Sequence, residues 1–325
     1  MADAPGRVLV TGASGFIGRR LAARYREMGA EVRGVDVAAD PERGVVAGDV
    51  TEPGAWQAQA EGCDLVVHTA AIIGFGGRHE RYWRVNALGA RRALDAAVRG
   101  GASRFLHLSS IVVFGIDFPD GVEETWPTRT TGSPYTDAKI VSEQAVLAAH
   151  AAGEVPCTIV RPGDVYGPRS GPWAISIVEA LKSGPLALPD GGRGIFSPVY
   201  VDNLVDGIVL AGSSPAAEGQ VFTLTDGVGM ENREYFGRFC EWLGKPPPRS
   251  LPGGLMKAAA WPIEKAAELR GRESNLNPAT VAYMQRKGTY SIRRAREVLG
   301  YEPRVGLDEG MERMREWLAA EGYLS

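Results

Sequence analysis

Three side chains in this sequence could together move a proton to or from a substrate oxygen. Tyr135 and Lys139 stand four residues apart in SPYTDAK, a spacing that places both on one face of a helix. A phenol can exchange a proton with a substrate oxygen, although its pKa of about 10 makes it a poor base at neutral pH. A nearby ammonium favours the phenolate, and Ser110, upstream in RFLHLSS, can donate to or accept from the same oxygen. The trio predicts acid–base chemistry on an alcohol or carbonyl oxygen.

The same tyrosine–lysine spacing recurs at Tyr283 and Lys287 in VAYMQRK. The first pair lies between two expected strands, 104–110 and 156–163, whereas the second has no companion serine and no flanking strands. Because the sequence around it differs in this way, we interpret the second pair as a coincidence.

A glycine-rich turn near the N-terminus is typical of a nucleotide pyrophosphate site. The apolar run 7–10 leads into TGASGFIG, where Gly12, Gly15 and Gly18 precede an expected helix. Glycine at these positions permits a tight turn, a close backbone approach to the anion and close packing of the helix on the strand. The free N–H groups and the positive dipole of a helix N-terminus attract the same anion. The alternative interpretation is an ordinary strand-to-helix turn.

Two acidic residues follow the next strands and suggest which dinucleotide binds. Asp36 lies near the end of the expected strand 31–37, where a carboxylate would bind the adenosine ribose hydroxyls of NAD and repel the 2′-phosphate of NADP. Arg33 lies earlier on this strand and is less well placed to accept a phosphate. Asp49 and Val50 end the third expected strand, at the adenine edge. A surface acid at a strand end is the alternative for each carboxylate.

The elements that position these residues alternate between strand and helix along the first half of the chain. Strands separated by helices predict right-handed crossovers and a parallel sheet covered on both faces. We therefore expect an α/β fold, a Rossmann-type doubly wound parallel sheet, in residues 1–165. Residues 166–325 are predicted to form a smaller, mostly helical substrate lobe, from which 221–227 returns to the sheet. The expected strands are 7–10, 31–37, 45–50, 64–71, 104–110 and 156–163, and the expected helices include 82–99, 134–150 and 307–318.

Composition excludes several classes of protein. The 325 residues carry 36 Lys and Arg against 39 Asp and Glu, which argues against a strongly basic nucleic-acid binder. Three cysteines without a CxxC pair suggest neither a disulfide framework nor a zinc site, and we expect no metal. No stretch of about 18 apolar residues predicts a membrane-spanning helix. With no secretory signal evident, a cytoplasmic location is expected.

Several motifs, in order along essentially the whole chain, resemble those of the extended short-chain dehydrogenase/reductase family. They are TGASGFIG, Asp36, HTAA at 68–71, LSSIVVFG, PYTDAK, RPGDVYGP and PVYVDNLVDGI. The resemblance implies that Tyr135 is the catalytic acid/base, that Ser110 orients the substrate and that Lys139 binds the nicotinamide ribose. It also implies that Asn86 supports the active-site geometry or a proton relay, although a surface amide is an equal alternative.

The resemblance further implies NAD as cofactor and a homodimer formed through the helices 82–99 and 134–150. The cofactor contacts that it implies are Gly12, Gly15, Phe16, Ile17, Gly18, Asp36, Asp49, Val50, Ala70, Ala71, Tyr135, Lys139 and Pro162.

Within that family, the sequence favours a dehydrogenase acting on a bulky apolar alcohol such as a 3β-hydroxysteroid. Members that use sugar nucleotides usually carry an Arg-Asp pair where Phe196 and Ser197 stand here, although Arg193 is close enough to substitute. Dehydratases place an Asp-Glu pair where Ile111 and Val112 follow Ser110. A nucleotide-sugar 4-epimerase is therefore the alternative, and a non-catalytic NAD-binding scaffold is a lesser one. The apolar segment 251–263 is expected either to receive the substrate or to pack the core of the lobe.

Overall fold

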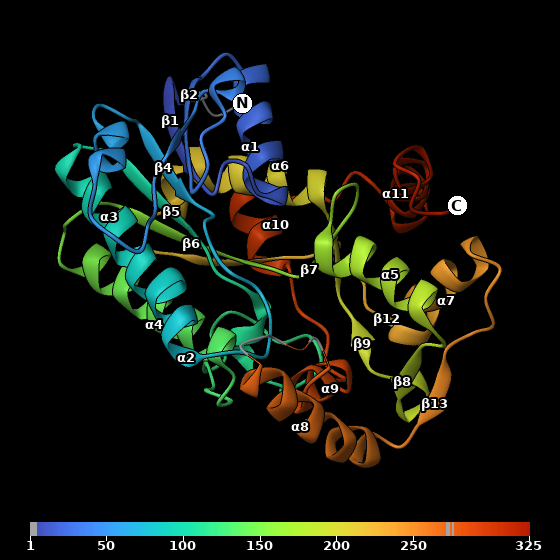
Figure 1. Cartoon of the computed structure of the whole chain (residues 1–325). Coiled ribbons are helices and arrows are strands. Elements are labelled where there is room, and N and C mark those ends of the chain that lie inside the picture. Colours follow the sequence, from blue (N-terminus) through green and yellow to red (C-terminus); the bar gives the residue numbers. More distant parts are fainter. Residues whose placement is uncertain (1–4, 271–273, 275) are drawn as a thin grey trace.

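A seven-stranded parallel sheet forms the centre of the computed structural model, which describes residues 5–270, 274 and 276–325. The strand order β3-β2-β1-β4-β5-β6-β11 reverses direction of growth after β1, so the carboxyl ends of β1 and β4 border a crevice. This confirms the predicted Rossmann-type α/β fold (Figure 1). The strands are β1 (Arg7–Thr11), β2 (Glu31–Asp36), β3 (Val45–Ala47), β4 (Leu65–His68), β5 (Arg104–Leu108), β6 (Cys157–Pro162) and β11 (Val221–Leu224).

Several expected strands are shorter in the structure than in the sequence-based prediction; β5, for example, ends at Leu108, so Ser109 and Ser110 follow it outside the strand. β3 ends at Ala47 and β4 at His68, so Asp49 and the TAA of HTAA leave the sheet. After β4 the chain is held by Thr69, whose N–H and hydroxyl both donate to the Thr11 carbonyl, at 3.2 and 2.7 Å. The residues beyond β4 therefore form a loop at the carboxyl edge of the sheet, where ligands bind in this architecture.

Helices cover both faces of the sheet, because each strand is apolar on both sides (Figure 1). One core packs α1, α6 and α10 against the sheet, with Leu21, Ile208 and Leu299 among its buried side chains. The other packs α3 and α4, with Leu94 and Val146. These helices are α1 (Phe16–Glu27), α3 (Gly89–Arg99), α4 (Pro134–Ala151), α6 (Val201–Ser213) and α10 (Arg293–Leu299).

The second half of the chain contains many helices and a third hydrophobic core. That core includes Tyr166, Phe196, Tyr235, Phe239 and Met314. β11 pairs in parallel with β6 in the central sheet, and α6 packs against one face of that sheet. The remaining helices are α2 (His79–Tyr82), α5 (Ser176–Ser183), α7 (Asn232–Trp242), α8 (Gly253–Leu269), α9 (Pro278–Met284) and α11 (Leu307–Ala320). The short strands are β7 (Asp164–Tyr166), β8 (Ala187–Pro189), β9 (Ile195–Phe196), β10 (Pro198–Tyr200), β12 (Met230–Glu231) and β13 (Arg249–Leu251).

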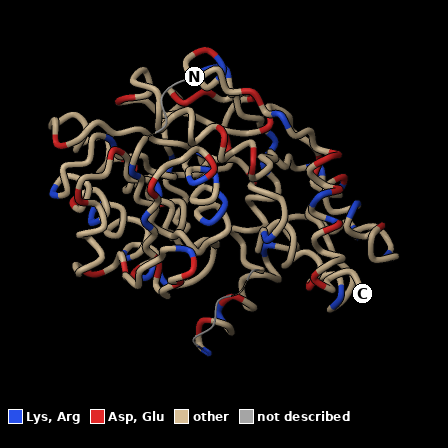
Figure 2. The backbone as a smooth tube through the Cα atoms, turned by 90° about the horizontal axis from the view of Figure 1, so that it is seen from above, with Lys and Arg blue, Asp and Glu red and all other residues tan. Residues whose placement is uncertain are grey.

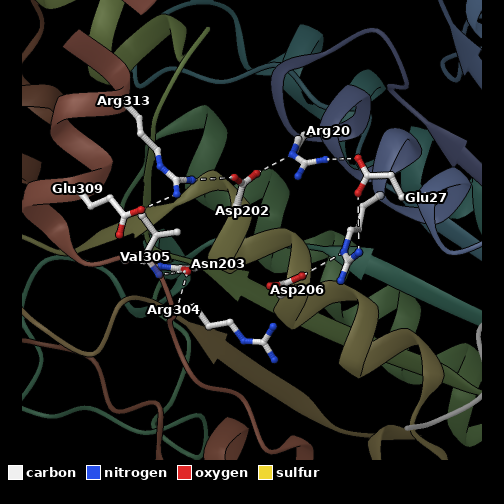
Figure 3. A network of polar contacts seen from close by, with 10 residues as sticks. Arg20, Glu27, Asp202, Asn203, Asp206, Arg304, Val305, Glu309 and Arg313 are labelled. Atoms are coloured by element: carbon white, nitrogen blue, oxygen red, sulfur yellow. Dashed lines mark hydrogen bonds and ion pairs between the residues drawn. The ribbon is translucent and has the colours of Figure 1, made fainter. Parts of the chain in front are cut away.

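The motif PVYVDN, residues 198–203, hydrogen-bonds the start of α6 to the chain segment that leads to α11 (Figure 3). Asn203 accepts the N–H groups of Arg304 and Val305 at 2.9 Å and donates to the Val305 carbonyl. Its neighbour Asp202 pairs with Arg20 of α1 at 2.6 Å. This ion pair is partly exposed to solvent, so it contributes little to the free energy of unfolding. The amide contacts satisfy backbone groups and fix the chain before α11.

Charges of both signs are interspersed over the backbone trace (Figure 2). Among the described residues, no helix has the length and apolar character needed to cross a membrane.

Candidate active site

The glycine-rich turn has the backbone conformation and the close contacts that exclude larger residues. Gly12 has a φ of +71°, and a Cβ on it would lie 2.7 Å from the Ala70 nitrogen. A Cβ on Gly18 would lie 2.1 Å from the Gly12 carbonyl oxygen. Gly15 is the N-cap of α1, whose first turn contains no acidic residue. The turn therefore presents free helix N–H groups and a positive dipole at the carboxyl edge of the sheet.

Asp36 lies beside this turn, at the end of β2. Its carboxylate accepts the N–H of Ser14 at 2.9 Å and that of Val37 at 2.8 Å, so it joins the second strand to the glycine-rich turn. Arg33 is occupied elsewhere, because its guanidinium donates to Glu31 and to the carbonyls of residues 59 and 61. A carboxylate, and not a guanidinium, is thus positioned at the turn.

The other residues expected to contact the cofactor lie in three places in the structure. Asp49 is exposed and accepts the N–H of Thr51, whereas Val50 is buried in the core under α3. The side chains of Phe16 and Ile17 pack against hydrophobic cores, and both residues lie in the first turn of α1. Ala70, Ala71 and Pro162 lie at the carboxyl ends of β4 and β6, near the same edge.

Ser110, Tyr135 and Lys139 meet at the carboxyl end of β5. The first is the N-cap of the short turn 111–114, and the other two are on the first turns of α4. All three are buried, and the Tyr135 and Ser110 side chains are hydrogen-bonded. The Lys139 Nζ donates to the Leu108 carbonyl at 2.7 Å, which anchors α4 to the strand that carries the serine.

Burial controls the ionisation of this trio. It raises the pKa of Tyr135 to about 12, against a smaller lowering by the hydrogen bond with Ser110. It also lowers the pKa of Lys139 to about 8, which Glu143 partly offsets. The phenol is therefore protonated at neutral pH, ready to donate to a carbonyl oxygen. The sequence predicts that the Lys139 ammonium favours the phenolate, whereas in this structure burial has the largest influence on the pKa of Tyr135 and raises it.

Asn86 is a buried clamp on the loop after β4. Only 1% of it is exposed, which rules out the surface-amide interpretation. Its Nδ2 donates to the Ile72 carbonyl and its Oδ1 accepts the Ile72 N–H, both at 2.9 Å. Asn86 lies in a π-helical stretch, 83–88, between α2 and α3. It thereby holds the loop that borders Tyr135.

Two stacked histidines lie beneath the site, and sequence reasoning did not single them out. His68 of β4 and His107 of β5 are paired in register, and their ring centroids are 5.6 Å apart. His68 contacts the Thr11 hydroxyl at 2.7 Å and His107 contacts that of Ser142 at 2.9 Å. Burial, with the nearby charge of Lys139, lowers the pKa of both, that of His68 to about 3. Both rings are neutral at physiological pH.

This burial predicts a contribution of His68 to acid sensitivity. Because its folded pKa of about 3 is below the usual 6.5, the unfolded chain binds more protons between these values, and stability falls as the pH falls through this window. Between pH 7 and pH 5 the loss is about 2 kcal/mol, at about 1.4 kcal/mol per pKa unit. We expect the free energy of unfolding of His68→Gln, measured in urea titrations, to fall between pH 7 and pH 5 by about 2 kcal/mol less than that of the wild type. An equal loss would contradict the assignment.

Aromatic side chains from distant segments surround Tyr135. Its ring centroid is 6.3 Å from those of Phe75 and Tyr82, and Phe75 is 4.7 Å from Tyr283. Trp173 packs against the same cluster. No periodic pattern in the sequence joins these four residues, because they come from separate elements.

The structure separates Tyr283 from Lys287. Tyr283 is buried, α9 ends at Met284 and Lys287 is exposed, so the pair does not share a helix face. The tyrosine nevertheless lies in the aromatic cluster around Tyr135, a proximity that our interpretation as a coincidence did not foresee.

Most of the positions at which the resemblance separates branches of the family are buried. Phe196 is fully buried, with its ring centroid 3.9 Å from that of Tyr235, and Ser197 is buried beside it. Arg193 is exposed. Ile111 and Val112, after Ser110, are also buried.

The segment 251–263 does not pack the core of the lobe. Its first residue, Leu251, ends β13, and residues 253–263 form the first part of α8, in which Leu255 is 61% exposed and Trp261 59% exposed. Gly253 and Gly254 belong to the first turn of this helix, so the expected glycine hinge lies inside regular structure.

Known proteins are similar to this chain over most of its length. A sequence model of the NAD dependent epimerase/dehydratase family matches residues 8–224. A 3-beta-hydroxysteroid dehydrogenase of Mycolicibacterium neoaurum is 30% identical, with 94% of this chain and 89% of that protein covered. A 3 beta-hydroxysteroid dehydrogenase/Delta 5→4-isomerase of Mycobacterium tuberculosis is also 30% identical, over 92% and 86%. The solved structure of MoeE5 in complex with UDP-glucose and NAD is 26% identical, with a TM-score of 0.78 and coverage of 97% and 99%.

Proposed function

The chain belongs to the NAD dependent epimerase/dehydratase family, and from this premise we propose that it oxidises a secondary alcohol on a bulky apolar substrate of the 3β-hydroxysteroid type. The observation that carries the proposal is the aromatic cluster around Tyr135, built from Phe75, Tyr82, Trp173 and Tyr283. Apolar walls with a few convergent polar groups suit a large apolar ligand. The names of the two mycobacterial relatives support the same substrate class.

NAD is the cofactor of this family, and the glycine-rich turn fits it. We propose that Gly12, Gly15 and Gly18, with the backbone at Phe16 and Ile17, hold the pyrophosphate, and that Asp36 holds the adenosine ribose. The exposed Asp49 and the backbone at Val50 would face the adenine, because the Val50 side chain is buried in the core. Ala70, Ala71, Pro162 and Lys139 would border the nicotinamide half. Bound NAD supplies the acceptor for the hydride from the carbinol carbon.

The catalytic roles follow from the contacts at β5. In the oxidation direction Tyr135 would accept the proton of the substrate hydroxyl, which requires its phenolate form, and the positive charges of Lys139 and of oxidised NAD would favour that form. Ser110, hydrogen-bonded to Tyr135, would orient the same substrate oxygen. Lys139 fixes α4 on β5 through the Leu108 carbonyl, and Asn86 keeps the adjoining loop in place. The surrounding aromatic side chains exclude water from the reacting carbon.

Two assays on the wild-type protein separate the candidate activities. Absorbance at the NADH wavelength is followed with NAD and a 3β-hydroxysteroid, and UDP-glucose is incubated with the protein and analysed by chromatography. Net NADH formation with the steroid is the expected result. Conversion of one sugar nucleotide into another, without NADH, would replace this proposal by a 4-epimerase.

The epimerase is the second candidate because MoeE5, 26% identical, was solved with UDP-glucose and NAD. Against it stands the burial of Phe196 where the family's sugar-nucleotide members usually carry a cation. A non-catalytic scaffold is disfavoured because Ser110, Tyr135 and Lys139 are all present and all buried near the carboxyl end of β5. If the protein shows neither steroid oxidation nor sugar-nucleotide conversion in the two assays, the non-catalytic scaffold is favoured.

Asp36 predicts a measurable preference for NAD over NADP. In Asp36→Ala the repulsion of the 2′-phosphate is lost, and the ratio of kcat/KM for NAD to that for NADP is expected to fall by about tenfold or more. Asp36→Asn isolates the effect of the charge, since it removes the charge but keeps an oxygen that accepts the Ser14 N–H. It should relax the preference as well. Equal affinity of the wild type for the two cofactors would contradict the assignment.

We further propose a cytoplasmic homodimer. Three buried free cysteines suit a reducing compartment. The helices α3 and α4 offer a mixed surface, next to which Leu88, the residue before α3, is exposed. A monomeric mass by light scattering at micromolar concentration would contradict the dimer.

A further inference from the structure

Tyr283 lies at the end of α9, next to the aromatic residues that surround Tyr135. Its ring centroid is 4.7 Å from that of Phe75 and 6.5 Å from that of Trp173, and Phe75 is in turn 6.3 Å from Tyr135. A substrate whose oxygen reached Tyr135 and Ser110 would therefore lie close to these rings.

A buried ion pair fixes the orientation of the Tyr283 side chain. The hydroxyl donates to Asp164 Oδ1 at 2.6 Å, and Asp164 Oδ2 accepts the Ser197 N–H and pairs with Arg286. The Arg286 guanidinium carbon is 3.7 Å from the Tyr283 ring centroid, and its Nη1 donates to the Tyr283 carbonyl. Because Asp164 and Arg286 are both about 1% exposed, solvent does not compete for these contacts.

The backbone around Tyr283 is held as firmly as its side chain. Asn277 caps α9 by accepting the Thr280 N–H at 2.8 Å. At the other end, Asn232 donates to the Met284 carbonyl at 2.9 Å and the Ile195 N–H donates to the Arg286 carbonyl at 2.7 Å. The ring is therefore a preorganised surface, and it needs no reordering when a ligand arrives.

We propose that Tyr283 is a specificity-determining residue: its ring is the wall against which the apolar body of the substrate packs. This inference rests on the proposed function and adds the residue that selects for a bulky apolar substrate. The only full charges in contact with the ring among the described residues, those of Asp164 and Arg286, are paired with each other. Arg286 is thus committed to a carboxylate, which leaves the wall suited to an apolar ring system and poor for a pyrophosphate.

The test is steady-state kinetics of Tyr283→Ala and Tyr283→Phe with NAD and a 3β-hydroxysteroid. Loss of an apolar contact surface in Tyr283→Ala is expected to raise KM for the steroid about tenfold or more, with kcat within about threefold and KM for NAD within about twofold. Tyr283→Phe keeps the ring, so its KM for the steroid should stay within about threefold of wild type, even if its melting temperature falls because Asp164 loses a donor.

Tyr290→Ala is the matched control, since Tyr290 is equally buried but belongs to a neighbouring cluster with Phe114 and Phe118. It should lower the melting temperature and leave KM for the steroid unchanged. If the wild type oxidises the steroid but Tyr283→Ala keeps its KM, or Tyr290→Ala raises KM as much, the inference is overturned and the proposed function stands. If the wild type neither oxidises nor binds the steroid, the proposed function fails and the inference with it.

Discussion

Tyr135→Phe is expected to lower kcat for alcohol oxidation by about 10²–10⁴-fold, the usual contribution of a general acid–base group. The change removes only the phenolic oxygen that is hydrogen-bonded to Ser110. The ring contacts with Phe75 and Tyr82 remain, so the fold and the apolar surroundings are preserved. NAD affinity, measured by calorimetry, should stay within about threefold of wild type because the glycine-rich turn is unchanged.

Tyr25→Phe provides a control for the loss of a buried hydroxyl. Tyr25 is fully buried in α1, and its hydroxyl has no hydrogen-bond partner among the described residues. Its removal should leave kcat unchanged. A comparable loss of turnover in both variants, or full turnover in Tyr135→Phe, would remove Tyr135 from the proposed mechanism.

Gly18→Ala is expected to raise the Kd for NAD by about 10–100-fold. A Cβ at this position would lie 2.1 Å from the Gly12 carbonyl oxygen and 2.9 Å from Thr69 Oγ1, so the turn or the helix must shift. Overpacking of this kind costs about 1–3 kcal/mol, and here the strain falls on the backbone that would hold the pyrophosphate. Calorimetric titration with NAD measures the effect directly.

Gly237→Ala controls for the general effect of replacing a glycine in a helix. Gly237 lies in α7, and nothing stands within 4 Å of the Cβ that alanine would add. The control should keep its NAD affinity and be more stable by about 0.5–1 kcal/mol, because alanine loses less backbone entropy on folding. Wild-type NAD affinity in Gly18→Ala would mean that this turn does not bind the cofactor.

The parts of the fold that sequence predicts well are those determined by local pattern. The alternation of apolar strands and helices was enough for the doubly wound sheet, and the turn before Phe16 needs glycines for reasons visible in the spacing alone. The ends of β3 and β4 were less accurate. The chain leaves β4 after His68 because of contacts with Thr11 and Asn86, and no local propensity encodes these.

The surroundings of the site depend on long-range packing. Tyr283 reaches the cluster near Tyr135 only because Asp164, 119 residues earlier, accepts its hydroxyl. The stacked rings of His68 and His107 likewise meet through strand pairing, although each taken alone reads as an ordinary strand residue. In both cases the residue types were visible in the sequence, but their proximity was not.

The central claim, net oxidation of an apolar secondary alcohol at Tyr135, is tested most directly by following an isotope. The wild-type protein is incubated with NAD and a 3β-hydroxysteroid that carries deuterium on its carbinol carbon, and the products are analysed by mass spectrometry. The account predicts one deuterium in the NADH for each ketosteroid formed, and no label transfer with Tyr135→Phe over the same interval. Unlabelled NADH would contradict it, and so would the absence of ketosteroid in this incubation while a parallel incubation with UDP-glucose gives an epimerised sugar nucleotide.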